Sequence, residues 1–237
     1  VAEGGSCSEE DEATLTLAQV YEYATTVPLE QIEWLADAER MNIGAAEVSF
    51  TGDYGHGLGR LMHNNARESI FGDTLFTKIL SYTSGACDAR MSGAMVPVMS
   101  NSGSGNQGIT ASVPVAVYAK ELGKTEEEML RAVALSDLVT IHQKTGIGRL
   151  SAYCGAISAG CGAGAGIAYL RGGRFHAVAH TVVNAIAILS GTICDGAKPS
   201  CAAKIASAVD AGILGYHMYL EDQQFYGGDG IITKGAD

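Results

Sequence analysis

The chain has 237 residues, of which 47% are hydrophobic and only 17% are charged. This composition argues against a disordered chain, because a sequence of this length can bury a sizeable apolar core. The formal net charge of −11 argues against a nucleic-acid-binding surface, which needs clustered Lys and Arg side chains. The sequence starts at Val1 without a Met or a signal peptide, so we expect a fragment or a processed chain.

The helical elements are predicted in chain order from apolar spacing and from turn residues. Apolar positions three and four apart predict a helix within residues 9–27, and Pro28 opens a second long pattern that runs to residue 50. Glycines over residues 51–59 predict a loop, and residues 68–94 predict a further helix. Thr125 and Glu128 form a capping box at the start of another helix. The last helices are predicted over residues 149–170, 175–194 and 199–219.

No alternating strand pattern or repeat interrupts these helices. The sequence therefore predicts an all-α fold, a compact multi-helix bundle with central Gly/Ala-rich helices. We expect residues 1–237 to form a single catalytic domain.

Residues 150–170 and 176–194 carry no charged residue over a membrane-spanning length, so a transmembrane hairpin is an alternative. The pairs Gly160/Gly164 and Gly162/Gly166 would suit such a hairpin. However, the first segment is mostly Ala, Gly and Ser, which gain little from lipid but allow close backbone packing. We therefore favour buried core helices.

The stretch "NSGSGNQGI" has Gly103, Gly105 and Gly108 at the spacing of a dinucleotide-binding turn. Such a site needs an acidic residue at a strand end about 20 residues on, but residues 126–128 lie at a helix start. We therefore expect no NAD. We favour an anion-binding turn, in which backbone N–H groups at a helix start serve as donors, over an ordinary flexible loop. The candidate carboxylate-binding residues are Ser100, Asn101, Ser102, Gly103, Ser104, Gly105, Asn106 and Gln107.

The six cysteines include no C-x2-C pair of the zinc-ribbon type, and a long chain without a secretion signal favours reduced thiols in the cytoplasm. Cys154 and Cys194 share a pattern, in which a glycine follows within two residues and a second cysteine follows seven residues on. Those second cysteines, Cys161 and Cys201, are expected to be ordinary core residues. A functional role is favoured for Cys154 and Cys194.

Three segments, "DARMSGAMVPVMSNSGSGNQGI", "IGRLSAYCG" and "ICDGAKPSCAAK", resemble the L-serine dehydratase α-chain-like family, and most closely its L-cysteine desulfidase branch. The resemblance runs from about Asp88 to Ile232 and continues more loosely upstream. It implies a mostly helical catalytic domain that holds an oxygen-labile 4Fe-4S cluster on three cysteines and leaves one iron open. By motif, Cys154 and Cys194 match two of the ligands.

The family's third ligand lies far upstream in a "GCT" motif, which this chain lacks and which Cys7 does not match. The family also usually continues beyond "GDGIITKG". The resemblance therefore implies a longer protein, of which this chain lacks an N-terminal part carrying the third ligand and a short C-terminal tail.

The activity implied by the resemblance is β-elimination of L-cysteine to pyruvate, ammonia and sulfide, without PLP, in the cytoplasm. L-Serine dehydration by the same mechanism is the alternative, and a helical membrane or scaffold bundle without chemistry is a second one. The sequence leaves the substrate open and also leaves a homo-oligomer open.

Four residues are candidates for the remaining roles. Lys144 and Lys198 would act as the base if desolvation lowers their pKa, or else as charge partners of an anionic cluster and substrate. Arg90 would clamp the substrate carboxylate or pair with an acid such as Asp88. His142 is another candidate base, although a lone helical His is more often a packing residue.

Overall fold

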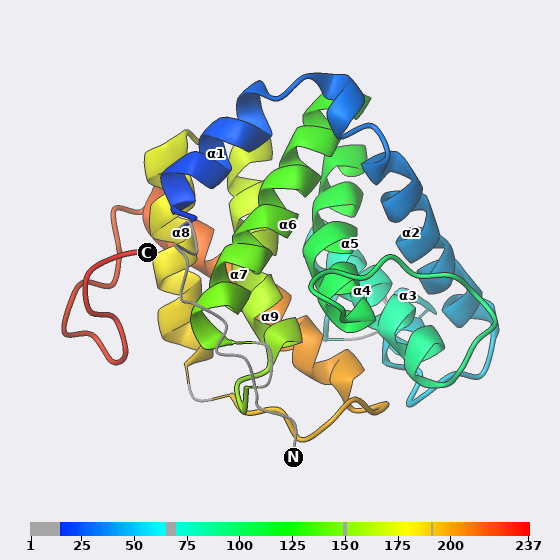
Figure 1. Cartoon of the computed structure of the whole chain (residues 1–237). Coiled ribbons are helices and arrows are strands. Elements are labelled where there is room, and N and C mark those ends of the chain that lie inside the picture. Colours follow the sequence, from blue (N-terminus) through cyan, green and yellow to red (C-terminus); the bar gives the residue numbers. More distant parts are fainter. Residues whose placement is uncertain (1–14, 65–69, 149–150, 191) are drawn as a thin grey trace, which may run out of the picture.

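The computed structural model describes residues 15–64, 70–148, 151–190 and 192–237, so Cys7 and the start of the first predicted helix lie outside the described part. The described residues form helices and loops without a β-strand, and the all-α prediction is confirmed. The helices, drawn in Figure 1, are α1 (Leu17–Thr26), α2 (Leu35–Thr51), α3 (Leu58–Asn64), α4 (Leu75–Met91), α5 (Gly105–Glu121), α6 (Glu126–Ile147), α7 (Gly155–Leu170), α8 (Phe175–Leu189) and α9 (Cys201–Leu220).

The helix boundaries differ from the predictions at several places: α3 was not predicted, α4 begins at Leu75 rather than at residue 68, and α7 begins at Gly155 rather than at residue 149. Two further differences concern the pattern after Pro28 and the one before Cys194. The long pattern after Pro28 begins with a separate 3₁₀ turn, η1 (Leu29–Gln31), and α2 starts only at Leu35. The pattern predicted over residues 175–194 ends at Leu189, and Ile193 and Cys194 lie outside the helix. Both differences leave backbone outside helices, and the second one places Cys194 in a loop.

Helix α7 is the central element of the bundle, because it packs against α5, α6, α8 and α9. Its small residues allow these close approaches: a side-chain carbon at Gly164 would lie 2.6 Å from the carbonyl oxygen of Gly212 in α9. One at Gly166 would lie 2.7 Å from a methyl group of Val115 in α5. The expectation of a buried Gly/Ala-rich core helix is therefore confirmed. No helix in the described part of the chain has the length and apolar character needed to cross a membrane.

The predicted capping box starts α6. Thr125 Oγ1 accepts a hydrogen bond from the backbone N–H of Glu128 (3.2 Å), and the Glu128 carboxylate accepts one from the backbone N–H of Thr125 (2.9 Å). The N–H of Thr125, followed by Lys124 and the Thr125 hydroxyl, lowers the pKa of Glu128 to about 2. The stabilising contribution of Glu128 is therefore complete above pH 4.5 and is lost as the pH falls toward 2.

We expect Thr125→Ala to lower the free energy of unfolding by about 1 kcal/mol, because it removes an N-cap side chain. Thr145→Ala is the matched control, since Thr145 is exposed in the same helix and its hydroxyl donates only to the carbonyl of Ile141 (3.0 Å). This control should be neutral or slightly stabilising, because Ala is the better helix former. Urea unfolding measures both variants, and equal losses would contradict the capping role.

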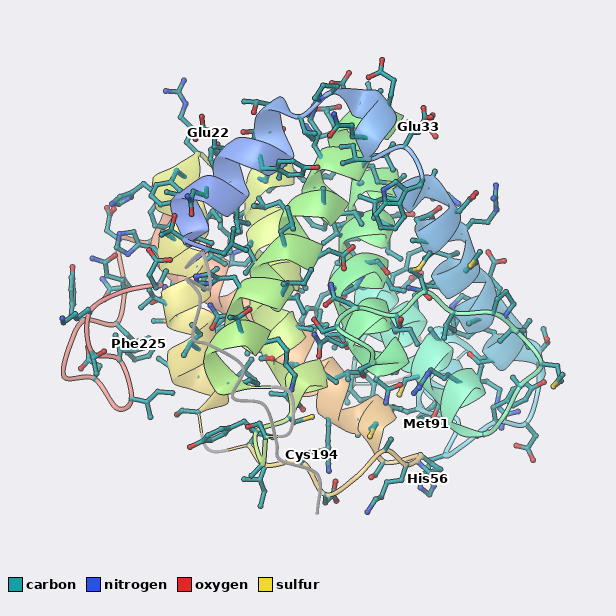
Figure 2. The ribbon with its side chains drawn as sticks, viewed as in Figure 1. Glu22, Glu33, His56, Met91, Cys194 and Phe225 are labelled. Atoms are coloured by element: carbon teal, nitrogen blue, oxygen red, sulfur yellow. The ribbon has the colours of Figure 1, made fainter. Side chains whose placement is uncertain are left out.

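The starts of α5, α7 and α9 lie toward one end of the bundle, the lower end in Figure 1. Contacts support this arrangement, since a side-chain carbon at Gly155, the first residue of α7, would lie 2.5 Å from Gln107 Oε1 in the first turn of α5. In Figure 2 the labelled residues Met91, His56 and Cys194 lie at the same end. Unpaired N–H groups at helix starts create positive potential, so this end favours anionic ligands.

Candidate functional site

Cys154 and Cys194 lie on neighbouring segments at the lower end of the bundle. The backbone N–H of Cys194 donates to the carbonyl of Ala152 (2.6 Å), and Tyr153 pairs with Ile193 in an isolated bridge. Cys154 occupies the N-cap position of α7 and is half-buried, whereas Cys194 is exposed. The structure therefore brings the two predicted ligands together.

Cys201 joins these two cysteines, although the sequence predicted only a core role for it. It is the first residue of α9 and is buried, as expected, but it also interacts electrostatically with Cys154. Burial raises the pKa of the Cys154 thiol first, and Cys194 and Cys201 raise it further. The sequence contained a signal against a shared helix face for Cys194 and Cys201. Pro199 lies between the two cysteines and disfavours one continuous helix there. Cys161, by contrast, is buried within α7 as predicted.

The five described cysteines are free thiols, and they are Cys87, Cys154, Cys161, Cys194 and Cys201. Among the described residues, no three His, Cys, Asp or Glu side chains are placed to hold a metal ion. A 4Fe-4S cluster imposes a wider spacing than a single ion, because each cysteine binds a different iron.

The two candidate lysines lie on different segments, Lys198 in the loop before α9 and Lys144 in α6. Lys198 is about half exposed and pairs with Asp195 in the loop between Cys194 and Cys201 (3.8 Å). Lys144 lies near the end of α6 and is half-buried. Its side chain reaches the start of α7, where a side-chain carbon at Gly155 would lie 3.6 Å from Lys144 Cδ. Lys204, which the sequence reasoning did not consider, forms an ion pair with Asp195.

The Ser100 to Gln107 stretch forms a tight turn followed directly by α5. Asn101 and Ser104 exchange two backbone hydrogen bonds (3.1 and 2.9 Å), and the turn between them places Ser102 and Gly103 at positive φ. Ser104 caps α5 by accepting from the N–H of Gln107 (3.3 Å). Ser102 and Gly103 are exposed, whereas Gly105 is buried. The stretch is thus a structured turn rather than a flexible loop, and it presents the first N–H groups of α5.

Several amide side chains of this stretch hold the turn in place. Asn101 Oδ1 accepts from Gln107 Nε2 (3.1 Å) and from the hydroxyl of Ser102 (3.0 Å). Asn101 Nδ2 donates to the carboxylate of Asp137 in α6 (2.9 Å). These side-chain groups are therefore occupied, and the N–H of Gln107 is bound by Ser104, which leaves the backbone N–H groups of Gly105 and Asn106 as the available anion donors of the first turn.

Arg90 covers the start of α5. Its Nη1 donates to Asn106 Oδ1 (2.9 Å), and a side-chain carbon at Gly105 would lie 2.9 Å from Arg90 Cζ. Glycine is thus needed at the first position of α5 for the guanidinium to lie there. The Cys87 thiol also contacts Asn106 Oδ1 (3.5 Å), and burial, followed by Cys201 and Asp88, raises its pKa. Arg90 is placed to meet an anion at the α5 start.

Asp88 holds the glycine-rich loop that contains His56. Its Oδ2 accepts from the backbone N–H of Gly59 (2.9 Å), whereas Oδ1 is buried without a partner in the described structure. Burial raises the pKa of Asp88, and the N–H groups of Gly59, Leu58 and His56 oppose this rise. Sequence reasoning predicted the loop but not its attachment.

His142 pairs with the carboxylate of Asp237 (3.0 Å), which suits the packing interpretation of that residue.

Comparison with known proteins gives a family. Residues 7–236 match the family described as "Serine dehydratase alpha chain". A UPF0597 protein of Bacteroides fragilis is 50% identical over 233 residues, which cover 98% of this chain and 54% of that protein. A UPF0597 protein of Desulfitobacterium hafniense is 51% identical over 236 residues, covering 99% and 54%, and one of Treponema denticola is 42% identical over 227 residues, covering 94% and 52%.

The chain spans about half the length of the curated relatives it matches. No solved structure matches it. The family match extends over nearly all of the sequence, including the Ser100 to Gln107 turn and the three neighbouring cysteines. The chain belongs to the serine dehydratase alpha chain family.

Proposed function

We propose that this chain carries the site of a cytoplasmic, iron–sulfur-dependent amino-acid lyase that converts L-cysteine to pyruvate, ammonia and sulfide. The observation that supports it most is the meeting of Cys154, Cys194 and Cys201 at the starts of α7 and α9. Membership of the serine dehydratase alpha chain family supports a lyase in general. L-Serine dehydration at the same site is the alternative substrate assignment.

Three thiols are the number of protein ligands that a 4Fe-4S cluster with one open iron would use. Neighbouring thiolates repel one another, and this repulsion contributes to the raised pKa of Cys154. Metal ions that replace the thiol protons would neutralise the repulsion. The helix starts and the lysines Lys198 and Lys204 would further favour an anionic cluster. We propose Cys201 as the third ligand, in place of the upstream ligand that the resemblance implied. The upstream part of the longer protein is then expected to complete other parts of the site.

When bound, the cluster would supply a Lewis-acidic iron that makes the β-substituent of the substrate a better leaving group. Arg90 and the first N–H groups of α5 would hold the substrate carboxylate. The same donors would stabilise negative charge that develops on the carboxylate as the α-proton leaves. They lie beside α7, since Gln107 contacts the start of that helix.

Lys144 is the better candidate for the base that accepts the α-proton. Its side chain is half-buried and lies against Gly155, the residue after Cys154. Lys198 is more exposed and pairs with the carboxylate of Asp195. Lys198 is therefore assigned to charge compensation.

Anaerobic reconstitution of the intact protein with iron and sulfide tests the proposal. We expect a visible absorption band and release of sulfide from L-cysteine, with kcat/KM higher than that for pyruvate release from L-serine. Pyruvate release from serine alone would support the dehydratase alternative. Iron incorporation without either activity would overturn the lyase proposal, and absence of both iron and activity would favour the scaffold alternative.

A further inference from the structure

A cavity of about 270 Å³ lies next to the Ser100 to Gln107 turn. Its walls come from α1, η1, α2, α6 and the segment before α5. It shares with the candidate site only the residues Ser100, Asn101 and Ser102, and neither the cysteines nor Arg90, Lys144 or Lys198 line it. We call it the Asp137 cavity, after the one Asp that lines it.

The walls of the Asp137 cavity are mainly apolar, and among the described residues that line it Asp137 is the only one with a charged side chain. Asn101 donates to its Oδ1 (2.9 Å) and to its backbone carbonyl (3.1 Å). Burial raises the pKa of Asp137 to about 6, which the hydrogen bond from Asn101 only partly opposes. A half-buried carboxylate whose one side-chain donor in the described structure is neutral is poorly compensated, so a cation in the cavity would stabilise it.

The aromatic residues of the cavity complement such a cation. Tyr23 and Trp34 line it with 47% and 55% of their surfaces exposed, and Leu35 and Ile141 lie among the apolar lining residues. Aromatic faces attract ammonium groups, while the aliphatic side chains favour an apolar body. The volume suits a small molecule, since it is near the lower limit of ordinary ligand sites.

We propose that the Asp137 cavity binds a small organic ammonium ion with an apolar body, such as an arylalkyl amine. The ammonium group would lie on the carboxylate of Asp137, and the apolar part between Trp34 and Ile141. This proposal does not rest on the lyase activity, because the cavity and the cysteine site are lined by different charged groups.

The cavity is connected to the cysteine site through Asn101. Its Nδ2 donates to Asp137, while its Oδ1 accepts from Gln107, whose Oε1 lies against Gly155 beside Cys154. A ligand on Asp137 would therefore adjoin two consecutive hydrogen bonds that reach Gln107, whose side chain packs against the start of α7.

Trp34 is the only tryptophan of the chain, so its fluorescence reports directly on the cavity wall. We would titrate this 237-residue chain with phenethylamine at pH 7.5 and compare 2-phenylethanol, its neutral analogue. We expect saturable quenching or a spectral shift with the amine, and at least about tenfold weaker binding of the alcohol. Calorimetry provides a second readout, and absence of both signals with the amine would overturn the proposal.

Asp137→Asn should weaken amine binding at least about tenfold while leaving binding of the alcohol nearly unchanged. Glu33→Gln is the matched control, because Glu33 is an exposed acid beside Trp34 that does not line the cavity; it is labelled in Figure 2. This control should retain wild-type affinity. Equal losses in both variants would indicate general electrostatic attraction and would overturn the assigned site.

The wild-type protein gives an independent test if Asp137→Asn does not fold. Protonation of Asp137 near pH 6 should weaken amine binding at pH 5 relative to pH 7.5, while the alcohol shows no such change. In the described part of the chain, Tyr23 is the only other lining residue with a titratable side chain. Amine binding that is unchanged between these pH values would contradict the role of the carboxylate.

Discussion

Alanine at Cys154, Cys194 or Cys201 is expected to abolish the visible absorption of protein reconstituted anaerobically with iron and sulfide. Each thiolate would bind a separate iron, so loss of one cysteine leaves a second iron without a protein ligand and makes the cluster unstable. Lyase activity should fall to background in the same variants. Absorption spectra and iron content of the purified proteins measure the effect without reference to turnover.

Cys161→Ala is the matched control for this series. Cys161 is a free thiol in α7, seven residues after Cys154, but it belongs to the buried core cluster of that helix. The variant should keep its cluster and lose only stability. If Cys201→Ala alone kept the absorption, the third ligand would be a residue other than Cys201. If Cys154→Ala and Cys194→Ala both kept it, the ligand assignment would be wrong.

Some helices could be predicted because local sequence signals, such as a cap or a run of small residues, determine them. The capping box at Thr125 marks the start of α6, and the Gly/Ala-rich composition of α7 predicts a helix that other helices approach closely. The η1 turn was not predicted, because the apolar pattern after Pro28 continues across the break. Apolar spacing reports which residues face the core, but it does not show where backbone hydrogen bonding is interrupted.

The candidate site could be predicted only in part, since its contacts join distant segments. Cys154 and Cys194 were identified from motifs, and the structure places them together. Cys201 was assigned to the core because a spacing of seven residues was read as one helix face. Gly196 at positive φ and the loop that follows it carry the chain to the start of α9 instead. The bond from Asn101 to Asp137 spans 36 residues, and no local pattern links the two.

Gly160→Ala is expected to lower the free energy of unfolding by about 3 kcal/mol. A side-chain carbon at Gly160 would lie 2.6 Å from the carbonyl carbon of Ala208 and closer still to its oxygen. Those atoms are backbone of α9, so they cannot move aside as a flexible side chain would. The two helices must separate, which also loosens the shared end that carries Cys154 and Cys201. Urea unfolding with an unchanged m-value measures the loss.

Gly44→Ala is the matched control, because Gly44 also lies inside a helix, α2, but a side-chain carbon there meets no atom within 4 Å. Removing the conformational freedom of this glycine should stabilise the protein by about 0.5–1 kcal/mol. The same chemical change is thus predicted to have opposite signs at two helical positions, and the difference isolates the contact between α7 and α9. Equal stability of the two variants would contradict that contact. It would also remove the support that this packing gives to a shared site at the starts of both helices.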